Sequence, residues 1–316
     1  PVFHVNAFSF SYLTSLIVGH ELILNTGFSL NDFWKVMNQT QPQIASVIPP
    51  ILRLLVEDPR SHEIPKSVKY FVSAASHLPK KTLLEFYSKF QIPVIQAYGL
   101  SETVNFSTTF PTNLSRDSYL QVLASDNKVS IGVEVWGNNL FILDDNNQVI
   151  SEENKIGEIV VRGWNLMNGY LDDSRSTESA FKNDYFYTGD IGYFKLIQNQ
   201  KFYFLNGRKK EIAKVNGKLI YLNELDEMLL SLSYVLSACC VSYFDLHQEE
   251  QLGLYVQTTG VQSPESILYD VHEMTKGQVK IKKIIFGNEI LMTPSGKKQR
   301  AEMARLHFNE TKVYDN

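Results

Sequence analysis

The first hundred residues alternate short runs rich in β-branched and aromatic side chains with longer segments of helical spacing. The short runs predict strands at 21–24, 45–48, 69–75 and 93–98, and the longer segments predict helices at 29–39, 49–57 and 79–90. Ser29 is a suitable cap for the first of these helices, and Pro79 is suited to open the last. Alternating strands and helices favour an α/β fold with a helix-covered, largely parallel sheet.

After Glu102 the pattern changes to short alternating strands separated by turn residues. The cluster Asp144–Asn147 lies between two apolar runs and predicts a hairpin. This section is therefore expected to form a small antiparallel β-structure that ends near Asn206. Its strands are predicted at 133–136, 139–150, 157–163, 194–197 and 201–205.

The remainder of the chain predicts a separate small α+β domain, with a boundary near Gly207–Lys210. Helices are expected at 223–232, 264–276 and 301–308, and strands at 237–243, 251–258 and 281–286. The predicted organisation is thus a large domain over 1–206 and a small one over 207–316. Within the large domain, 1–115 is assigned to the α/β sheet and 116–206 to the β-subdomain.

Composition narrows the class of protein further. The formal net charge of −4 over 316 residues provides no general attraction for nucleic acid or anionic lipid. The apolar stretch 8–24 is shorter than the ~20 residues of a spanning helix and contains charged Glu21, so no membrane span is expected. The adjacent pair Cys239 and Cys240 cannot build a disulfide framework, which favours a reducing, cytoplasmic compartment. Pro1 stands where a complete chain would have methionine and leads into a strand-like run, so a piece of a longer protein is expected.

Two segments offer groups suited to a nucleotide. QAYGLSE (96–102) follows a predicted strand, and ligands bind at strand carboxyl ends in open α/β sheets. Tyr98 offers a flat face to a base, Ser101 a hydroxyl to a phosphate and Glu102 a hard oxygen to Mg²⁺. In YTGDIG (187–192), Asp190 could accept hydrogen bonds from sugar hydroxyls. The alternatives are an ordinary strand-to-loop turn and a solvent-facing turn aspartate.

Two basic segments follow. In NGRKKEIAKVNGKLI (206–220) a solvated edge strand would explain the lysines, whereas Gly207 suits a flexible pivot and Gly217 a close backbone approach. In MTPSGKKQR (292–300), Lys297 could bring a point charge to a phosphate or carboxylate. A basic surface loop is the alternative interpretation there.

Taken together and in this order, the segments resemble the adenylate-forming superfamily of acyl-CoA synthetases, coumarate ligases, beetle luciferases and peptide-synthetase adenylation domains. The resemblance covers nearly the whole chain. It rests on PVFHVNAF (1–8), SAASHL (73–78), QAYGLSE, IGEIVVRGWNLMNGYL (156–171), YTGDIG, NGRKKEIAKVNGKLI and TPSGKKQR (293–300).

The resemblance implies a two-step reaction with ATP, Mg²⁺ and a thiol, which is coenzyme A or the phosphopantetheine arm of a carrier protein. A carboxylic acid is first joined to AMP and then passed to the thiol. Lys297 and Ser101 would act on the α-phosphate, Glu102 would hold Mg²⁺, and His4 would gate the thiol channel. The nucleotide-binding residues implied are Ser73, Ala74, Ala75, Ala97, Tyr98, Gly99, Asp190 and Arg208.

The resemblance also implies that the small domain rotates between the two steps, with Lys210 as the hinge. Lys214, Asn216 and Gly217 would then border the thiol. Leu222 and Asp226 replace the family's usual proline and glutamate, a change expected to affect packing more than chemistry. The family's phosphate-binding loop has no counterpart in these 316 residues.

For the acid, Val5 and Asn6 occupy the expected acyl pocket, where amino-acid-activating members carry an aspartate. An acid without an α-amino group is therefore expected, and Asn6 favours a small or functionalised one. The leading hypothesis is an AMP-forming acid–thiol ligase. The alternatives are an enzyme that loads a carrier protein in a biosynthetic cluster and a truncated, non-catalytic nucleotide-binding homologue.

Overall fold

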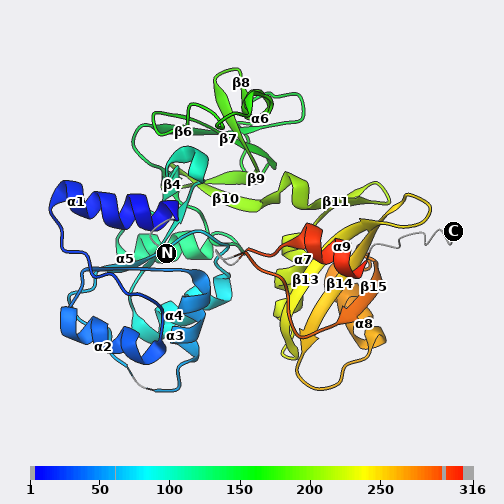
Figure 1. Ribbon diagram of the computed structural model, residues 1–316, viewed down its shortest axis with the longest axis horizontal. Coiled ribbons are helices and arrows are strands. Elements are labelled where there is room, and N and C mark those ends of the chain that lie inside the picture. The colour runs from blue at the N-terminus through cyan, green and yellow to red at the C-terminus, as the bar shows by residue number, and fades with distance from the viewer. Residues whose placement is uncertain (1–3, 61, 294–296, 309–316) are drawn as a thin grey trace. The chain divides into compact units, whose positions relative to one another are not determined.

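A computed structural model describes residues 4–60, 62–293 and 297–308. The chain divides into two compact units, Pro1–Leu205 and Asn206–Asn316, which run from blue to green and from yellow-green to red in Figure 1. The division falls within strand β10 (Gln200–Arg208), beside the boundary expected from the sequence at Gly207–Lys210.

The first sheet has the strand order β1-β2-β3-β4-β5. Its parallel part comprises β1 (Ile44–Val47), β2 (Tyr70–Ser73) and β3 (Val94–Tyr98), joined through helices α3 (Pro49–Glu57) and α4 (Lys80–Phe90). The short strands β4 (Thr108–Thr109) and β5 (Val133–Glu134) are added antiparallel at one edge. The predicted helix-covered, largely parallel sheet is therefore confirmed, and it extends past residue 115 to include β5.

Helix α2 (Leu30–Thr40) begins at its predicted cap, where Ser29 Oγ accepts a hydrogen bond from the Asp32 amide at 3.3 Å. Together with α5 (Arg116–Ala124), the helices bury one apolar core against the sheet. Its largest fully buried side chains include Phe71, Phe86 and Phe110. This core fixes the strand ends that carry the candidate site.

The N-terminal segment differs from the prediction. Asn6–Leu13 forms a π-helix, η1, that continues directly into α1 (Thr14–Val18), visible as one rod in Figure 1. Gly19 ends the rod in the left-handed conformation. Residues 20–25, all of them described, have no regular secondary structure, so the predicted strand at 21–24 is wrong. Apolar runs of this kind do not distinguish a strand from a helix, because their periodicity is ambiguous.

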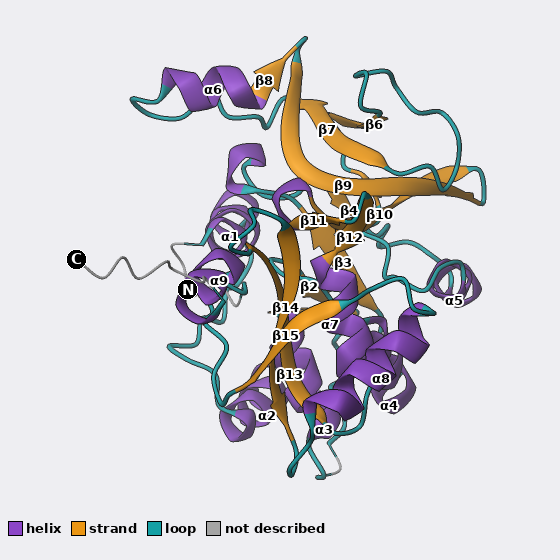
Figure 2. Cartoon of the chain, turned by 90° about the vertical axis from the view of Figure 1, so that its right-hand side faces the viewer, coloured by secondary structure: helices purple, strands orange, loops and turns teal. Residues whose placement is uncertain are grey.

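The second sheet of this unit has the order β10-β9-β7-β6, with β8 (Phe181–Lys182) paired to β9. Strands β6 (Asn138–Leu143), β7 (Gly157–Gly163) and the long, bent β9 (Tyr185–Ile197) pair antiparallel (Figure 2). Helix α6 (Ser174–Ala180) precedes β8. The predicted turn at Asp144–Asn147 closes with a 2.9 Å hydrogen bond from the Asn147 amide to the Asp144 carbonyl, which confirms the hairpin.

The second unit contains a hairpin, β11 (Ile212–Val215) with β12 (Lys218–Tyr221), and the sheet β13 (Val235–Phe244), β14 (Glu250–Thr258) and β15 (Ile281–Phe286). Helices α7 (Leu222–Leu230) and α8 (Pro264–Thr275) share one apolar core with this sheet, and α9 (Arg300–His307) shares another. Cys240 belongs to the first core and Cys239 to the second, as alternation along a strand requires. No helix in the described ranges has both the length and the apolar character needed to cross a membrane.

Candidate active site

The carboxyl ends of β2 and β3 lie side by side and carry the first group of predicted site residues. Ser73 pairs in register with Gln96, directly before Ala97 and Tyr98. Ser73, Ala74, Ala97 and Tyr98 are buried, and Ala75 turns the chain away from the sheet with φ +73°. Within the described residues, Ser73 Oγ and Gln96 Oε1 are buried without a hydrogen-bond partner. This edge of the sheet therefore presents unused polar groups.

Tyr98 and Asp190, 92 residues apart in the sequence, meet at this edge. The Tyr98 hydroxyl donates to Asp190 Oδ2 at 2.7 Å, and the two residues are only 8% and 4% exposed. The Asp190 amide donates to Thr188 Oγ1 at 3.0 Å, a bond that holds the backbone conformation from Thr188 to Asp190. A solvent-facing turn is thus the wrong interpretation of Asp190: the residue is buried within β9. Gly189, with φ +70°, lies at the irregularity where the β7–β9 register shifts.

The loop after β3 is tightly folded. A Cβ added to Gly99 would lie 1.5 Å from the Asn105 carbonyl oxygen, so only glycine fits there without movement. Thr103 Oγ1 accepts from the Leu100 amide at 2.9 Å, and Val104 has φ +49°, a rare conformation for a β-branched residue. Backbone strain of this kind is often found at functional sites. Ser101 lies exposed at the start of the one-turn helix η2 (Ser101–Thr103).

Glu102 in this loop is tied to the segment 167–170. The Tyr170 hydroxyl donates to Glu102 Oε1 at 3.0 Å, and the Met167 amide donates to the Glu102 carbonyl oxygen at 2.8 Å. Burial and the hydrogen bond to Glu102 raise the pKa of Tyr170. Tyr170, Thr188 and Gly189 line an open cavity of about 730 Å³. One of its lining residues is thus bonded to Glu102, and two others directly precede Asp190 in the chain. Among the described residues no three His, Cys, Asp or Glu side chains gather into a metal cluster.

His4, Val5 and Asn6 lie at the start of η1. His4 Nδ1 accepts from the Asn6 amide at 3.3 Å, and Asn6 Oδ1 is buried without a partner among the described residues. The rings of Phe10 and Phe106 contact each other at 5.4 Å between centroids. This contact joins the helical rod to the loop that carries Ser101 and Glu102.

In the second unit, Arg208 ends β10 and Lys210 lies exposed in the short helix η3 (Lys209–Glu211). The amide of Lys214 donates to Glu250 Oε2 at 2.9 Å. Asn216 and Gly217, with φ +51° and +76°, form the two-residue turn between β11 and β12. No heavy atom of the described residues lies within 4 Å of a Cβ added to Gly217, so within the chain it is the positive φ that favours glycine at this position.

Lys297 is exposed and lies three residues before α9. The Thr293 amide donates to the Lys297 carbonyl oxygen at 2.8 Å, and the Lys297 amide donates to Thr293 Oγ1 at 3.0 Å. Met292 and Lys298 form an antiparallel bridge. Pro294, Ser295 and Gly296, which belong to the segment TPSGKKQR, lie outside the described ranges.

Comparison with known proteins identifies the family. Residues 1–171 match the AMP-binding enzyme family. The chain belongs to this family. The resemblance expected from the sequence to adenylate-forming enzymes is thereby confirmed.

Two similar curated relatives are the sulfoacetate–CoA ligase of Cupriavidus necator, 27% identical over 96% of this chain and 57% of the relative, and the oxalate–CoA ligase of Arabidopsis thaliana, 28% identical over 98% and 59%. A similar solved structure is the o-succinylbenzoate CoA synthetase of Bacillus subtilis in complex with its acyl-adenylate intermediate. It is 25% identical, with a TM-score of 0.81 over 96% of this chain and 59% of that one. Another structure of the same synthetase contains ATP and a magnesium ion. The chain therefore spans less than two thirds of these relatives.

The chain also has a charge cluster around Asp226, a residue whose difference from the family pattern was expected to affect packing. Asp226 is 2% exposed and bonds to the side chains of Lys298 and Arg300. The sequence contained a signal for this cluster, because helical spacing places Asp226 on the same face as Leu222, Leu225 and Leu229. An acidic residue on an apolar face requires a buried partner.

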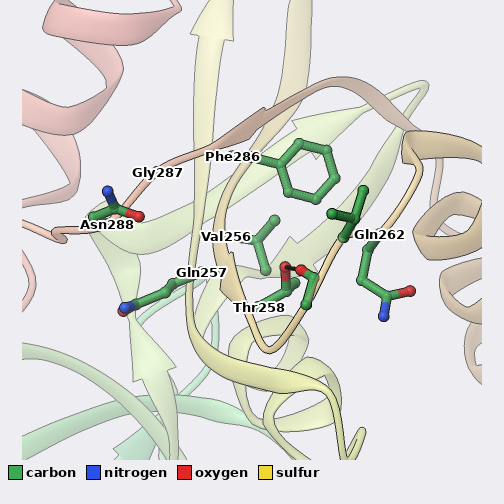
Figure 3. A pocket seen from close by; sticks show the side chains of 9 residues that line it. Val256, Gln257, Thr258, Gln262, Phe286, Gly287 and Asn288 are labelled. Carbon is green, nitrogen blue, oxygen red and sulfur yellow. Dashed lines mark hydrogen bonds between the residues drawn. The ribbon is translucent and has the colours of Figure 1, made fainter.

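Tyr170, Thr103 and Thr188 are further residues that sequence reasoning did not single out. They support Glu102, the tight loop and Asp190 respectively. A second open groove, of about 490 Å³, lies in the second unit against β14 and β15 (Figure 3). Val256, Thr258 and Phe286 are among its lining residues, and none of the predicted site residues lines it.

Proposed function

We propose that the protein activates a carboxylic acid as its acyl-adenylate with ATP and then transfers the acyl group to the thiol of coenzyme A. The observation that carries this proposal is the buried Tyr98–Asp190 hydrogen bond at the end of β3. It sets an aromatic ring and a buried carboxylate against each other at the position where α/β sheets bind ligands. The curated relatives are named CoA ligases, which supports coenzyme A as the acceptor.

In the proposed complex the base lies against Tyr98 and the chain at Ser73–Ala75, and the ribose hydroxyls donate to Asp190. Ala97 and Gly99 contribute backbone at the same sheet edge, and Arg208 assists at the ribose. The unpartnered Ser73 Oγ and Gln96 Oε1 suit a polar ligand here, because buried polar groups require hydrogen-bond partners. The ring of Tyr98 supplies area for stacking.

Glu102 fits a magnesium ion. Its side chain is half-buried and accepts a hydrogen bond from the hydroxyl of Tyr170, a residue that lines the 730 Å³ cavity. Mg²⁺ in nucleotide sites is typically bound by one or two carboxylates together with substrate phosphates. When bound, the ion would neutralise phosphate charge. Ser101 is exposed next to Glu102 and would donate its hydroxyl to the α-phosphate.

In the first step, a carboxylate oxygen of the acid bonds to the α-phosphorus, and the bond to the bridging oxygen breaks to release pyrophosphate. Lys297 would stabilise the charge that develops there. In the second step, the thiol sulfur bonds to the acyl carbon, the thiol proton passes to solvent, and AMP leaves with the former carboxylate oxygen. Lys214, Asn216 and Gly217 would border the thiol, with His4 as the gate and Lys210 as the pivot between the steps.

The acid we propose is small, carries a second polar or charged group and lacks an α-amino group. Asn6 Oδ1, buried without a partner among the described residues, suits a hydrogen-bond donor on the acid or on a bridging water. Sulfoacetate and oxalate, named for two relatives, are acids of this size. Val5 supplies the apolar side of the same pocket.

The test is acid-dependent exchange of pyrophosphate into ATP by the native protein, followed by thioester formation on addition of coenzyme A. A panel of small dicarboxylic and sulfonated acids is compared with amino acids and with long-chain acids. The proposal expects exchange with at least one of the small acids. Failure of AMP to bind, together with absence of exchange across the whole panel, would contradict it.

A further inference from the structure

The loop that carries Lys297 rests on one buried carboxylate. Asp226 Oδ2, on α7, accepts from Lys298 Nζ at 2.5 Å and from Arg300 Nη2 at 2.7 Å. Its other oxygen, Oδ1, accepts from the Cys240 amide of β13 at 2.6 Å. The residue next to Lys297 and the residue three positions after it are therefore held by the same side chain.

Arg300 anchors this arrangement within the second unit. It is 8% exposed, and its Nη1 donates to the Cys240 carbonyl oxygen at 2.7 Å. Its Nη2 also donates to Asn223 Oδ1, while Asn223 Nδ2 donates to Glu211 Oε2 at 2.9 Å. Burial disfavours the charged guanidinium, but the attraction of Asp226 outweighs it and raises the pKa of Arg300. Arg300 therefore stays charged.

Backbone hydrogen bonds also hold the base of this loop. Its backbone bonds join Thr293 to Lys297 and Leu291 to Gln299, and it packs little apolar surface, since Met292, Lys297 and Gln299 are exposed. Buried charge-assisted hydrogen bonds are strong and directional.

We infer that Asp226 is a positioning residue: through Lys298 and Arg300 it holds the Lys297 loop in the geometry that adenylation needs. The inference rests on the proposed function, because it assigns Lys297 to the first step. Asp226 does not touch substrate in this role. A purely structural role is the competing explanation, and it would lower both steps in proportion to the loss of folded protein.

The experiment compares Asp226→Asn with Lys297→Ala in the full protein. Both variants are assayed for pyrophosphate exchange and for thioester formation from supplied acyl-adenylate. Asp226→Asn keeps the shape of the side chain and loses its charge, so exchange should fall about 10- to 100-fold, as for other partners that orient a reactive group. Thioester formation should stay within about threefold of wild type, since its charge stabilisation does not use Lys297.

Epistasis provides the decisive readout. If Asp226 acts through Lys297, adding Asp226→Asn to Lys297→Ala should lower exchange by less than about threefold more, because the effects of residues that act as a unit do not add. Asp226→Glu, which keeps the charge, should recover part of the exchange rate. The matched control is Glu302→Gln in α9, the helix that also contains Arg300. It removes an exposed ion pair with Arg305 and should leave both steps unchanged.

Asp226→Asn leaves Arg300 buried beside a neutral amide, which destabilises the fold. A second variant therefore tests the inference without this loss of stability. Lys298→Met removes one of the two cations, whose side chain is 22% exposed, and leaves the Asp226–Arg300 pair intact. It should lower exchange at least about fivefold at an unchanged unfolding midpoint. Wild-type exchange in Lys298→Met, or multiplicative losses in the double variant, would overturn the inference. Unaltered exchange in Lys297→Ala would instead overturn the proposed role of Lys297.

Discussion

At the scale of single residues, the candidate site depends on the carboxylate of Asp190, which is buried and has a hydrogen-bond partner. Asp190 is 4% exposed, and an isolated carboxylate in such surroundings would be costly. The Tyr98 hydroxyl donates to its carboxylate, and the Thr188 hydroxyl accepts from its backbone amide. Its position is therefore set before any ligand arrives, and preorganisation of this kind reduces the entropy lost on binding.

This arrangement predicts different effects for the two partners. Asp190→Asn should weaken AMP binding about 10- to 100-fold, because hydrogen bonds to a charged acceptor contribute roughly 1.5–3 kcal/mol. Tyr98→Phe keeps the ring that stacks on the base and should weaken binding less than about tenfold. Isothermal titration of AMP into both variants measures the difference. Equal losses in the two variants would show that the hydrogen bond serves the fold and that Asp190 does not contact the ribose.

Glu102 leads to a second prediction, on magnesium. Glu102→Gln should raise the Mg²⁺ concentration needed for half-maximal pyrophosphate exchange about tenfold or more, since the amide keeps the shape but loses the charge that a hard cation prefers. Tyr170→Phe is the matched control: it removes the 3.0 Å hydrogen bond and leaves the carboxylate. An Mg²⁺ titration of both variants decides the assignment. A midpoint in Glu102→Gln that equals the midpoint in Tyr170→Phe would place the ion elsewhere.

At the scale of elements, the loop after β3 is shaped by the absence of one side chain. The Asn105 carbonyl occupies the space that a Cβ at Gly99 would need. The backbone at Asn105 therefore packs directly against Gly99, where the loop begins, and Val104 adopts a positive φ. Both features direct Ser101 and Glu102 to one side of the strand end.

Gly99→Ala should accordingly destabilise the protein by roughly 1–3 kcal/mol or more, the usual cost of overpacking. Gly19→Ala is the control in the same unit: Gly19 has φ +75° with no described heavy atom within 4 Å, so only the left-handed strain, about 1 kcal/mol, applies. Urea unfolding of both variants measures the difference. The larger loss, and a weaker affinity for AMP, are expected only in Gly99→Ala. A midpoint in Gly99→Ala that equals the wild-type midpoint would mean that the loop yields without cost.

The elements also show where sequence reasoning works. The bounds of α3, β7 and β15 were predicted to the residue, because a clear period and turn residues at both ends leave one interpretation. The two-residue strand β4 is too short for a period, and the helix η1 arises from an apolar run that fits either state. The burial of Asp190 was missed because Thr-Gly-Asp is typical of turns, whereas here the glycine lies at an irregularity inside β9.

At the same scale, the charge cluster shows a different limit. The positions of Asp226 and Arg300 were visible in the sequence, but their partnership was not, because 74 residues separate them. A helix pattern reports which face is buried, and it does not report what covers that face. Pairing across such distances requires the tertiary fold, as the meeting of Tyr98 with Asp190 also does.

At the scale of the whole molecule, the two units each contain their own core, and the chain passes between them in β10 and η3. Lys210 is exposed in η3, next to Glu211, which is bonded to Asn223. A short 3₁₀ turn suits a pivot, because a change in the φ and ψ angles of a few residues can redirect the chain there.

If Lys210 is this pivot, Lys210→Pro should separate the two steps. Proline fixes φ near −65° and disfavours the helical conformation at Lys209, so the second unit should be restricted to one orientation. We expect pyrophosphate exchange to persist and acyl-adenylate to accumulate, while thioester formation falls about 100-fold or more. Lys210→Ala removes the same side chain without fixing the backbone, so it should retain both rates. Measuring both steps on both variants distinguishes a backbone pivot from an exposed linker lysine, for which proline would lower the two rates in parallel or leave both unchanged.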